Sequence, residues 1–172
     1  MKRFLMCLGI ATCLSQVAHA DPMDDLDAAQ QKVFDAWQSV PFSQRAVLFE
    51  TGSSSGFGMY TDRKSNVFKP NEKIITYVEP VGYGWKDLPD NVFELNIIAD
   101  LKLLSEHGDV LNEQKAFSTN DLKSHHANME FSMDFTLSLT DVPVGKYKIE
   151  YTLHDVSTKQ DSTFQQDIVI AE

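Results

Sequence analysis

The sequence predicts a mainly-β protein, an antiparallel two-sheet sandwich of immunoglobulin-like type with one amphipathic helix at its N-terminus. Three observations lead to this prediction. Segments with an apolar period of two follow one another after Pro41. Turn residues separate these segments at short intervals. An apolar period of three to four residues is found only before Pro41, so no helices intervene between the strands and antiparallel pairing is expected.

The first 20 residues have the pattern of a removable export signal. Lys2 and Arg3 precede the mostly apolar run Phe4–Leu14, and Ala18-His19-Ala20 is a typical cleavage site. We expect cleavage after Ala20 and a mature chain of 152 residues that starts at Asp21. The sequence thus divides into a signal peptide (1–20), an N-terminal helix (21–41) and a β-sandwich domain (42–172).

Cysteine usage indicates the compartment. Cys7 and Cys13 both lie in the signal, which excludes a disulfide framework, a thiolate metal site and a cysteine nucleophile from the mature domain. An exported domain without cysteines or glycosylation sequons fits a bacterial envelope, so we expect a periplasmic or secreted protein. Because Ile10-Ala11-Thr12-Cys13 loosely resembles a lipobox, lipidation of Cys13 is the alternative.

The charge of the chain excludes two classes of partner. Beyond Ala20 there are 13 Lys and Arg against 25 Asp and Glu, which gives a net charge of −12. Such a surface repels the phosphates of nucleic acids, so nucleic-acid binding is not expected. No later segment approaches the roughly 18 uninterrupted apolar residues that a membrane-spanning helix needs, so we also expect no integral membrane span.

The helix is expected to begin at Pro22 and to end before Pro41. Acidic residues occupy its early turns, where they favour the positive end of the helix dipole. One apolar stripe is predicted to dock on the rest of the domain, and it consists of Leu26, Ala29, Val33, Trp37 and Val40.

The first part of the sandwich contains short elements. In order, they are a strand at Ala46–Phe49, a flexible loop at Gly52–Gly58, a strand at Met59–Asp62, a turn at Asn66–Lys73, and a strand at Ile74–Val78 that stops at Pro80.

The strongest strand signals are the alternating runs Phe93–Leu103 and Met129–Leu139, each with one face toward a core. The expected core residues are Phe131, Phe135 and Leu137 beside Leu95, Ile97, Tyr147 and Ile149. The other predicted elements are a turn at His107–Asp109, a strand at Val110–Phe117, a turn at Pro143–Gly145, a strand at Tyr147–Leu153, a turn at Ser157–Asp161 and a strand at Phe164–Ile170.

Two segments resemble known proteins. The pattern from Leu137 to Tyr151, with Val142-Pro143-x-Gly145-x-Tyr147 at its centre, is similar to the closing strands of many bacterial immunoglobulin-like sandwiches. The segment Asn71–Trp85 resembles a signature of uncharacterised secreted bacterial proteins. These resemblances imply an immunoglobulin-like β-sandwich and an exported protein, and they imply no activity.

Catalytic and metal-binding patterns are weak. Gly52-Ser53-Ser54-Ser55-Gly56 matches the hydrolase elbow G-x-S-x-G, but no helix follows it, so we interpret it as a loop. His125-His126, with Glu130, His107 or His154, lacks the spacing of a metal site. His154 with Asp155, and Glu79 with Arg63, are possible charge pairs without a third catalytic member. We therefore expect no enzyme activity, no metal and no cofactor.

Four aromatic residues are the candidate binding residues: Phe57, Tyr60, Tyr83 and Trp85. They lie on two glycine-rich connections, where Pro80 and Gly82 are expected to make a turn and Gly84 to let the backbone approach a neighbour closely. Aromatic rings on loops can stack on a sugar or anchor a protein contact. Alternatively, the rings cover an end of the sheet, or Trp85 packs on the helix beside Trp37.

The sequence therefore predicts a non-enzymatic periplasmic β-sandwich protein that acts through contact with an envelope protein. An open strand edge offers a further mode of contact, because it can accept an additional strand. The alternative is a module that binds a small ligand or a carbohydrate through its aromatic loops. The oligomeric state is left open by the sequence.

Overall fold

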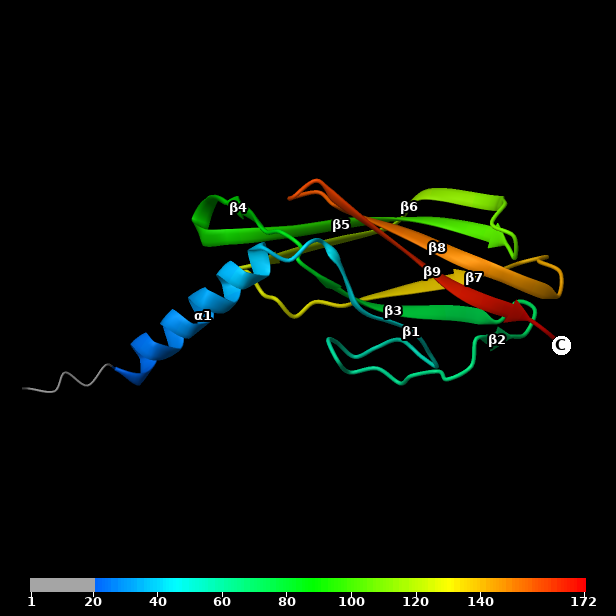
Figure 1. The fold of residues 1–172 in the computed structure, drawn as a ribbon, viewed down its shortest axis with the longest axis horizontal. Helices are drawn as coiled ribbons and strands as arrows, with labels where there is room; N and C mark the ends of the chain where they lie inside the picture. The colour runs from blue at the N-terminus through cyan, green and yellow to red at the C-terminus, as the bar shows by residue number, and fades with distance from the viewer. Residues whose placement is uncertain (1–20) are drawn as a thin grey trace, which may run out of the picture. The chain divides into compact units, whose positions relative to one another are not determined.

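The computed structural model describes residues 21–172, so the export signal and the cleavage or lipidation site lie outside the described residues (Figure 1). The chain divides into two units, of which the first ends at Val33 and the second comprises Phe34–Glu172. The helix α1 (Pro22–Gln38) crosses this division, and all strands belong to the second unit.

The predicted helix is confirmed, with Asp24 and Asp25 in its first turn. It ends at Gln38, so Val40 lies beyond it. Trp37 is its buried residue and belongs to the second unit. Docking of the stripe up to Val33 stays a prediction.

The smaller sheet has three antiparallel strands in the order β1 (Ser43–Glu50), β3 (Lys73–Val81) and β7 (Met133–Ser138). The prediction that Pro80 stops β3 is wrong, because the strand continues to Val81. Pro80 lacks a backbone N–H, and it is tolerated since β7 pairs with β3 only as far as Val78. On the other side of β3, the register with β1 shifts just after Gln44, the partner of Pro80.

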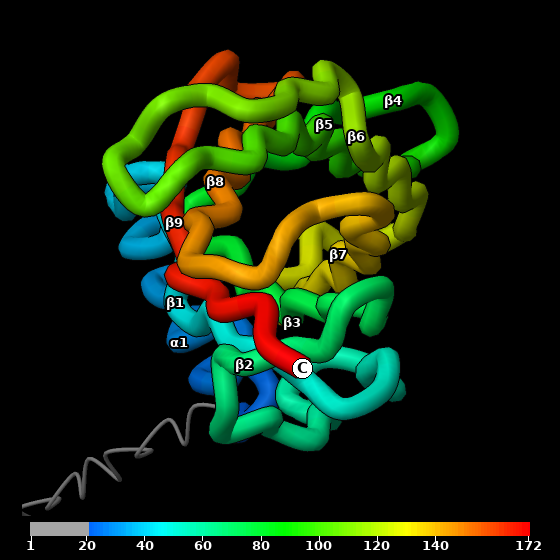
Figure 2. Tube along the Cα trace, turned by 90° about the vertical axis from the view of Figure 1, so that its right-hand side faces the viewer, coloured from blue at the N-terminus to red at the C-terminus, as the bar shows by residue number. Residues whose placement is uncertain are grey.

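The larger sheet has six strands (Figure 2). Its order is β2 (Val67–Phe68), β9 (Gln160–Ile170), β8 (Gly145–Asp155), β5 (Val92–Ser105) and β4 (Lys86–Leu88), with β6 (Val110–Ser124) pairing on β5. The two sheets form the layers of a sandwich, which confirms the predicted fold class. One pair departs from it, because the short β2 runs parallel to β9.

Some local predictions are corrected by the structure. Met59–Asp62 is not a strand, because only Asp62 forms an isolated bridge, with Glu50. Met129–Leu139 is a strand only from Met133 to Ser138, since the residues before it form an irregular connection. Three short elements had no predicted counterpart, namely β2, β4 and the 3₁₀ helix Pro89–Asn91.

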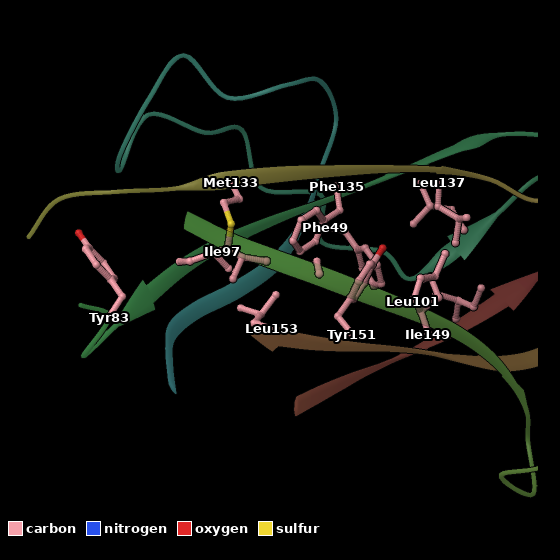
Figure 3. Close-up of a cluster of buried hydrophobic side chains, with 14 of the residues drawn as sticks. Phe49, Tyr83, Ile97, Leu101, Met133, Phe135, Leu137, Ile149, Tyr151 and Leu153 are labelled. Atoms are coloured by element: carbon pink, nitrogen blue, oxygen red, sulfur yellow. The ribbon is translucent and has the colours of Figure 1, made fainter. Parts of the chain in front are cut away.

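The core lies between the two sheets (Figure 3). Met133, Phe135 and Leu137 of β7 are buried, whereas the intervening Thr136 is exposed, as strict alternation requires. The Phe135 ring stacks on Tyr151 of β8 with their centroids 4.8 Å apart. Of the other predicted core residues, Leu95, Ile97 and Ile149 are buried, and Phe131 and Tyr147 are partly buried against them.

Candidate functional site

Tyr83, one of the four aromatic candidates, is a core residue. It is only 2% exposed, and its ring meets Trp37 edge-on at a centroid distance of 5.0 Å. The Trp37 indole Nε1 donates a hydrogen bond of 3.0 Å to the Tyr83 carbonyl. Within the second unit, the Tyr83 ring therefore packs on the last turns of the helix and does not form a free surface.

The other three candidates are more accessible. Trp85 is partly buried, and its Nε1 donates to the Asn128 carbonyl at 3.0 Å. Tyr60 is 38% exposed and lies 4.6 Å from the Tyr77 ring, and Phe57 is half-buried in the same loop. Tyr83 and Trp85 both donate to the Asn128 carbonyl, whereas Tyr60 contacts Tyr77. A joint binding role for the four candidates stays a prediction.

The predicted turn at Pro80 and Gly82 is present only in part, because Pro80 lies within β3 and the chain bends at Gly82. Gly82 has a φ of +74°, and a Cβ there would lie 2.4 Å from the Val40 carbonyl oxygen. A Cβ on Gly84 would lie 2.5 Å from the Thr158 side chain, which confirms that Gly84 permits a close approach. The neighbour is therefore the turn between β8 and β9.

Asp155 explains why the chain comes so close at Gly84. This carboxylate is only 1% exposed, and it accepts bonds from the Gly84 amide (2.7 Å), the Ser157 amide (2.8 Å) and the Thr158 hydroxyl (2.7 Å). The proposed pairing of His154 with Asp155 is thus wrong, because consecutive residues of β8 point to opposite faces. Asp155 stabilises the turn and ties it to Gly84.

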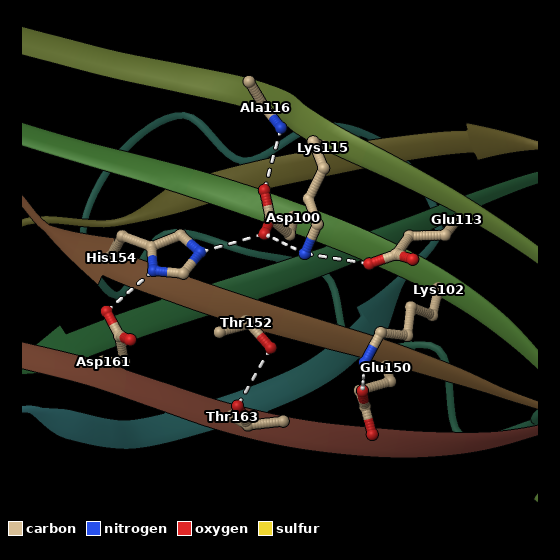
Figure 4. A network of polar contacts seen from close by, with 10 residues as sticks. All are labelled: Asp100, Lys102, Glu113, Lys115, Ala116, Glu150, Thr152, His154, Asp161 and Thr163. Carbon is tan, nitrogen blue, oxygen red and sulfur yellow. Dashed lines mark hydrogen bonds and ion pairs between the residues drawn. The ribbon is translucent and has the colours of Figure 1, made fainter. Parts of the chain in front are cut away.

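A polar network lies on the outer face of the larger sheet (Figure 4). Three residues of β6, 115–117, face the single residue Asp100 of β5, and Ala116 has a φ of +49° in this bulge. Asp100 accepts hydrogen bonds from the Ala116 amide (2.8 Å) and from the Lys115 ammonium (2.9 Å). Burial by itself would raise the pKa of Asp100, but the hydrogen bonds outweigh it and lower the pKa to about 2.

His154 continues this network to β9. One ring nitrogen lies 3.0 Å from Asp100 and the other 2.7 Å from Asp161. Its hydrogen bonds with Asp100 and then Asp161 raise the pKa of His154. The network joins the four strands β5, β6, β8 and β9. Because each charge in it has a partner of opposite sign, the arrangement resembles a structural ion-pair network more than a reaction centre.

The other predicted polar constellations are separated in the structure. Arg63 pairs with Glu72 at 2.6 Å and not with Glu79, whose carboxylate accepts from Tyr77. His125 contacts the Asn91 carbonyl at 3.0 Å. Within residues 21–172, no group of three His, Cys, Asp or Glu side chains is arranged to hold a metal ion. Nor does any helix in this range have the length and apolar character to cross a membrane.

A hollow that no sequence motif predicted lies between the two sheets of the second unit, where β6 and β7 face each other. We call it the edge groove, and its volume is about 680 Å³. The buried Leu101 and Leu103 of β5 and Leu137 of β7 contribute to its lining. Its further lining residues include Leu111, Glu113, Leu139, Asp141, Val142 and Tyr147.

Two unpaired strand edges flank the edge groove. In the described part of the chain, β6 pairs only with β5 and β7 pairs only with β3, so each has a free edge. Glu113 and Asp141 are the charged residues that line the groove, and both are acidic. The groove therefore combines an apolar floor, backbone groups available for pairing, and two acidic residues, of which Glu113 pairs with Lys115 at 2.8 Å.

Comparisons with known proteins by sequence and by structure give different results. No protein family and no curated protein matches the chain. A calcium-binding mutant of Bacteroides uniformis β-glucuronidase 2 matches with 10% identity and a TM-score of 0.40, over 75% of this chain and 14% of that chain.

The CARDB domain of a Pyrococcus furiosus protein matches in two structures. Its crystal structure in complex with di-metal ions gives 14% identity and a TM-score of 0.33, over 77% of this chain and 99% of that domain. Its solution structure gives 15% identity and a TM-score of 0.29, over 73% of this chain and 95% of that domain. At these TM-scores the matches transfer no ligand, partner or activity to this chain.

Proposed function

We propose that this chain is a non-enzymatic binding protein of the bacterial envelope, periplasmic after cleavage behind Ala20, which acts through contact with another protein. The observation that carries this proposal is the edge groove between the free edges of β6 and β7. An apolar hollow beside an unpaired strand suits an extended peptide, because the strand edge binds its backbone and the hollow its side chains.

The charge of the protein narrows the class of partner. Glu113 and Asp141 line the groove, and the formal net charge of the whole chain is −10. An extended segment that carries apolar side chains between basic residues complements both features. We therefore propose such a segment of a partner protein as the occupant.

The alternative, a small-ligand or carbohydrate module built on the aromatic loops, has less support. Tyr83 is enclosed in the core, and Trp85 uses its indole N–H within the chain. A small apolar ligand in the edge groove would be a different outcome, since a volume of about 680 Å³ also suits such molecules.

Site-specific photo-crosslinking in living cells tests the proposal. Leu111 lines the groove and is 52% exposed, whereas Val156, at 47%, is an exposed control in the β8–β9 turn outside the groove lining. A photoreactive amino acid at position 111, but not at 156, is expected to capture a protein through an extended basic and apolar segment. Equal capture at both positions, or a small-molecule adduct alone, would contradict the proposal.

Introducing a positive charge at the same positions tests the affinity. Leu111→Lys removes apolar contact and places a cation where the proposed segment carries its own basic residues, so we expect binding of the captured segment to weaken about tenfold or more. Val156→Lys adds the same charge outside the groove and is expected to leave the affinity unchanged. Calorimetric titration of both variants with a synthetic peptide of the captured segment provides the measurement.

A further inference from the structure

The segment Thr51–Thr61, which we call the serine loop, covers part of the outer face of the smaller sheet. Its ends are joined by a hydrogen bond from the Thr51 amide to the Thr61 carbonyl (3.0 Å). In its first half, the Ser54 amide and hydroxyl both donate to Asp134 of β7, at 2.8 and 2.9 Å. In its second half, the Gly58 amide donates to the Tyr77 hydroxyl of β3 at 2.7 Å. Two polar contacts thus hold the loop on the sheet.

Beneath this loop lies a carboxylate without a donor. Glu50 ends β1 and is only 3% exposed, and neither of its oxygens has a hydrogen-bond partner. A buried carboxylate in this state is costly, because desolvation disfavours its charge and no bond compensates. Glu50 pairs with Ile75, and Ile75 pairs with Thr136, so Asp134, two residues before Thr136, lies on the same face of the sheet as Glu50. Its carboxylate, which accepts from Ser54, is the charged group that acts on Glu50 most strongly.

No cation balances these two acids in the described contacts. From β3, Tyr77 and Glu79 face the loop side of the sheet, and Tyr77 donates to Glu79 at 2.7 Å. From the chain that follows the loop, Asp62 pairs with the exposed Lys64. Arg63 pairs with Glu72 at 2.6 Å. The negative charges of Glu50 and Asp134 are therefore not balanced by a neighbouring cation.

We propose that Glu50 and Asp134 share one proton, and that this proton latches the serine loop onto the smaller sheet. A protonated Glu50 donates to Asp134, which still accepts from Ser54, so the buried negative charge of Glu50 is removed and its hydroxyl has an acceptor. When the proton leaves, two negative charges face each other in a site with little water. Lifting the loop admits water to both carboxylates and removes the Ser54 contacts.

The titration range follows from the same geometry. Burial, followed by the charge of Asp134 and by the hydrogen bond that a protonated Glu50 donates to it, raises the pKa of Glu50 to about 7, against a smaller opposite effect of the nearby Ser54 backbone. Since the closed loop binds the proton more tightly than the open one, the latch is complete below the ordinary pKa of a glutamate. It weakens as the pH rises toward 7 and stays weak above it.

The loop also forms part of a second hollow beside β6 and β7. This hollow, of about 530 Å³, is lined by Ser54–Gly56, by Thr119–Leu122 and by Phe131–Asp134. Release of the loop would remove one of its walls, so the proton controls access to this end of the sandwich. The latch is a property of the free protein and does not rest on the proposed function.

Two measurements on the unmodified chain test the latch. Carboxyl ¹³C NMR should show Glu50 titrating near pH 7, and a midpoint near the usual 4.5 would overturn the proposal. Hydrogen exchange of the Ser54 and Gly58 amides, corrected for intrinsic rates, should accelerate on the order of 50- to 100-fold between pH 5 and pH 8. Unchanged protection across this range would equally overturn it.

Variants separate the latch from general charge effects. Glu50→Gln is neutral at every pH and can donate to Asp134, so its loop should stay protected at pH 8. Glu130→Gln, which removes the same charge from an exposed residue, should retain the pH dependence. If Glu50→Gln does not fold, the NMR midpoint alone decides. Full restoration of protection at pH 8 by micromolar Ca²⁺ would instead identify a cation site and reject the shared proton.

Discussion

Residues that are neighbours in sequence differ sharply in burial, and we expect them to differ in their contribution to stability. Phe135 is 1% exposed and stacks on Tyr151, whereas Thr136 points to solvent on the other face of β7. The alternation in sequence that predicted this difference holds because β7 has one face on the core.

Replacing these two residues tests the difference. Phe135→Ala should lower the free energy of unfolding by about 3–5 kcal/mol, since the lost ring leaves a cavity in addition to the lost transfer energy. Thr136→Ala should cost less than about 1 kcal/mol. Urea unfolding of both variants measures these values, and equal costs would mean that β7 is buried on both faces.

At the scale of elements, polar side chains join strands that are distant in sequence. Asp100 of β5 contacts β6 through Lys115 and Ala116, and β8 through His154, which reaches Asp161 of β9. The bulge at Ala116 turns its amide toward Asp100, so the irregular register has a clear electrostatic role.

The stability contribution of His154 should depend on pH in a defined direction. Because Asp100 and Asp161 raise the pKa of His154 in the folded state, its contribution is complete below the unfolded value of 6.5. It is lost as the pH rises through the folded pKa. His154→Gln should therefore destabilise the protein more at pH 6 than at pH 8.5 in urea unfolding.

A second histidine provides the control for this measurement. His107 lies in an exposed turn, so His107→Gln should change stability little at either pH. A cost of His154→Gln that is equal at both pH values would show that the protonated ring is not what stabilises these four strands.

At the scale of the whole molecule, the predicted export signal would decide where the acidic sandwich works. If cleavage follows Ala20, the intact mass of the periplasmic form should correspond to residues 21–172. The Ala-x-Ala pattern is what a signal peptidase recognises in an extended segment. A lipid-bearing species that begins at Cys13 would contradict this prediction and place the protein on a membrane leaflet.

The proposed peptide binding and the proposed pH response also belong to this scale, because each depends on strands that are far apart in the sequence. The edge groove needs β5, β6 and β7 together, and the serine loop needs β1 and β7. Neither the edge groove nor the contacts of the serine loop correspond to a motif in the sequence. Glu50 reads as the last residue of a strand, and Ser54 as one of three serines in a flexible loop. A buried acid near a serine-rich loop has no spacing signature when its partner, Asp134, is 84 residues away.

The sequence by itself determined the helix before Pro41, the alternating core faces of β5, β7 and β8, and the close approach at Gly84. These features depend on local periodicity and on backbone freedom, which neighbouring residues encode directly. Tertiary structure alone decided that Tyr83 lies in the core, that Asp155 binds Gly84 while His154 binds Asp100, and that β6 and β7 leave free edges around a hollow. Those outcomes depend on which strands meet and on which face each side chain enters, and such long-range pairing is set by the packing of the whole sandwich.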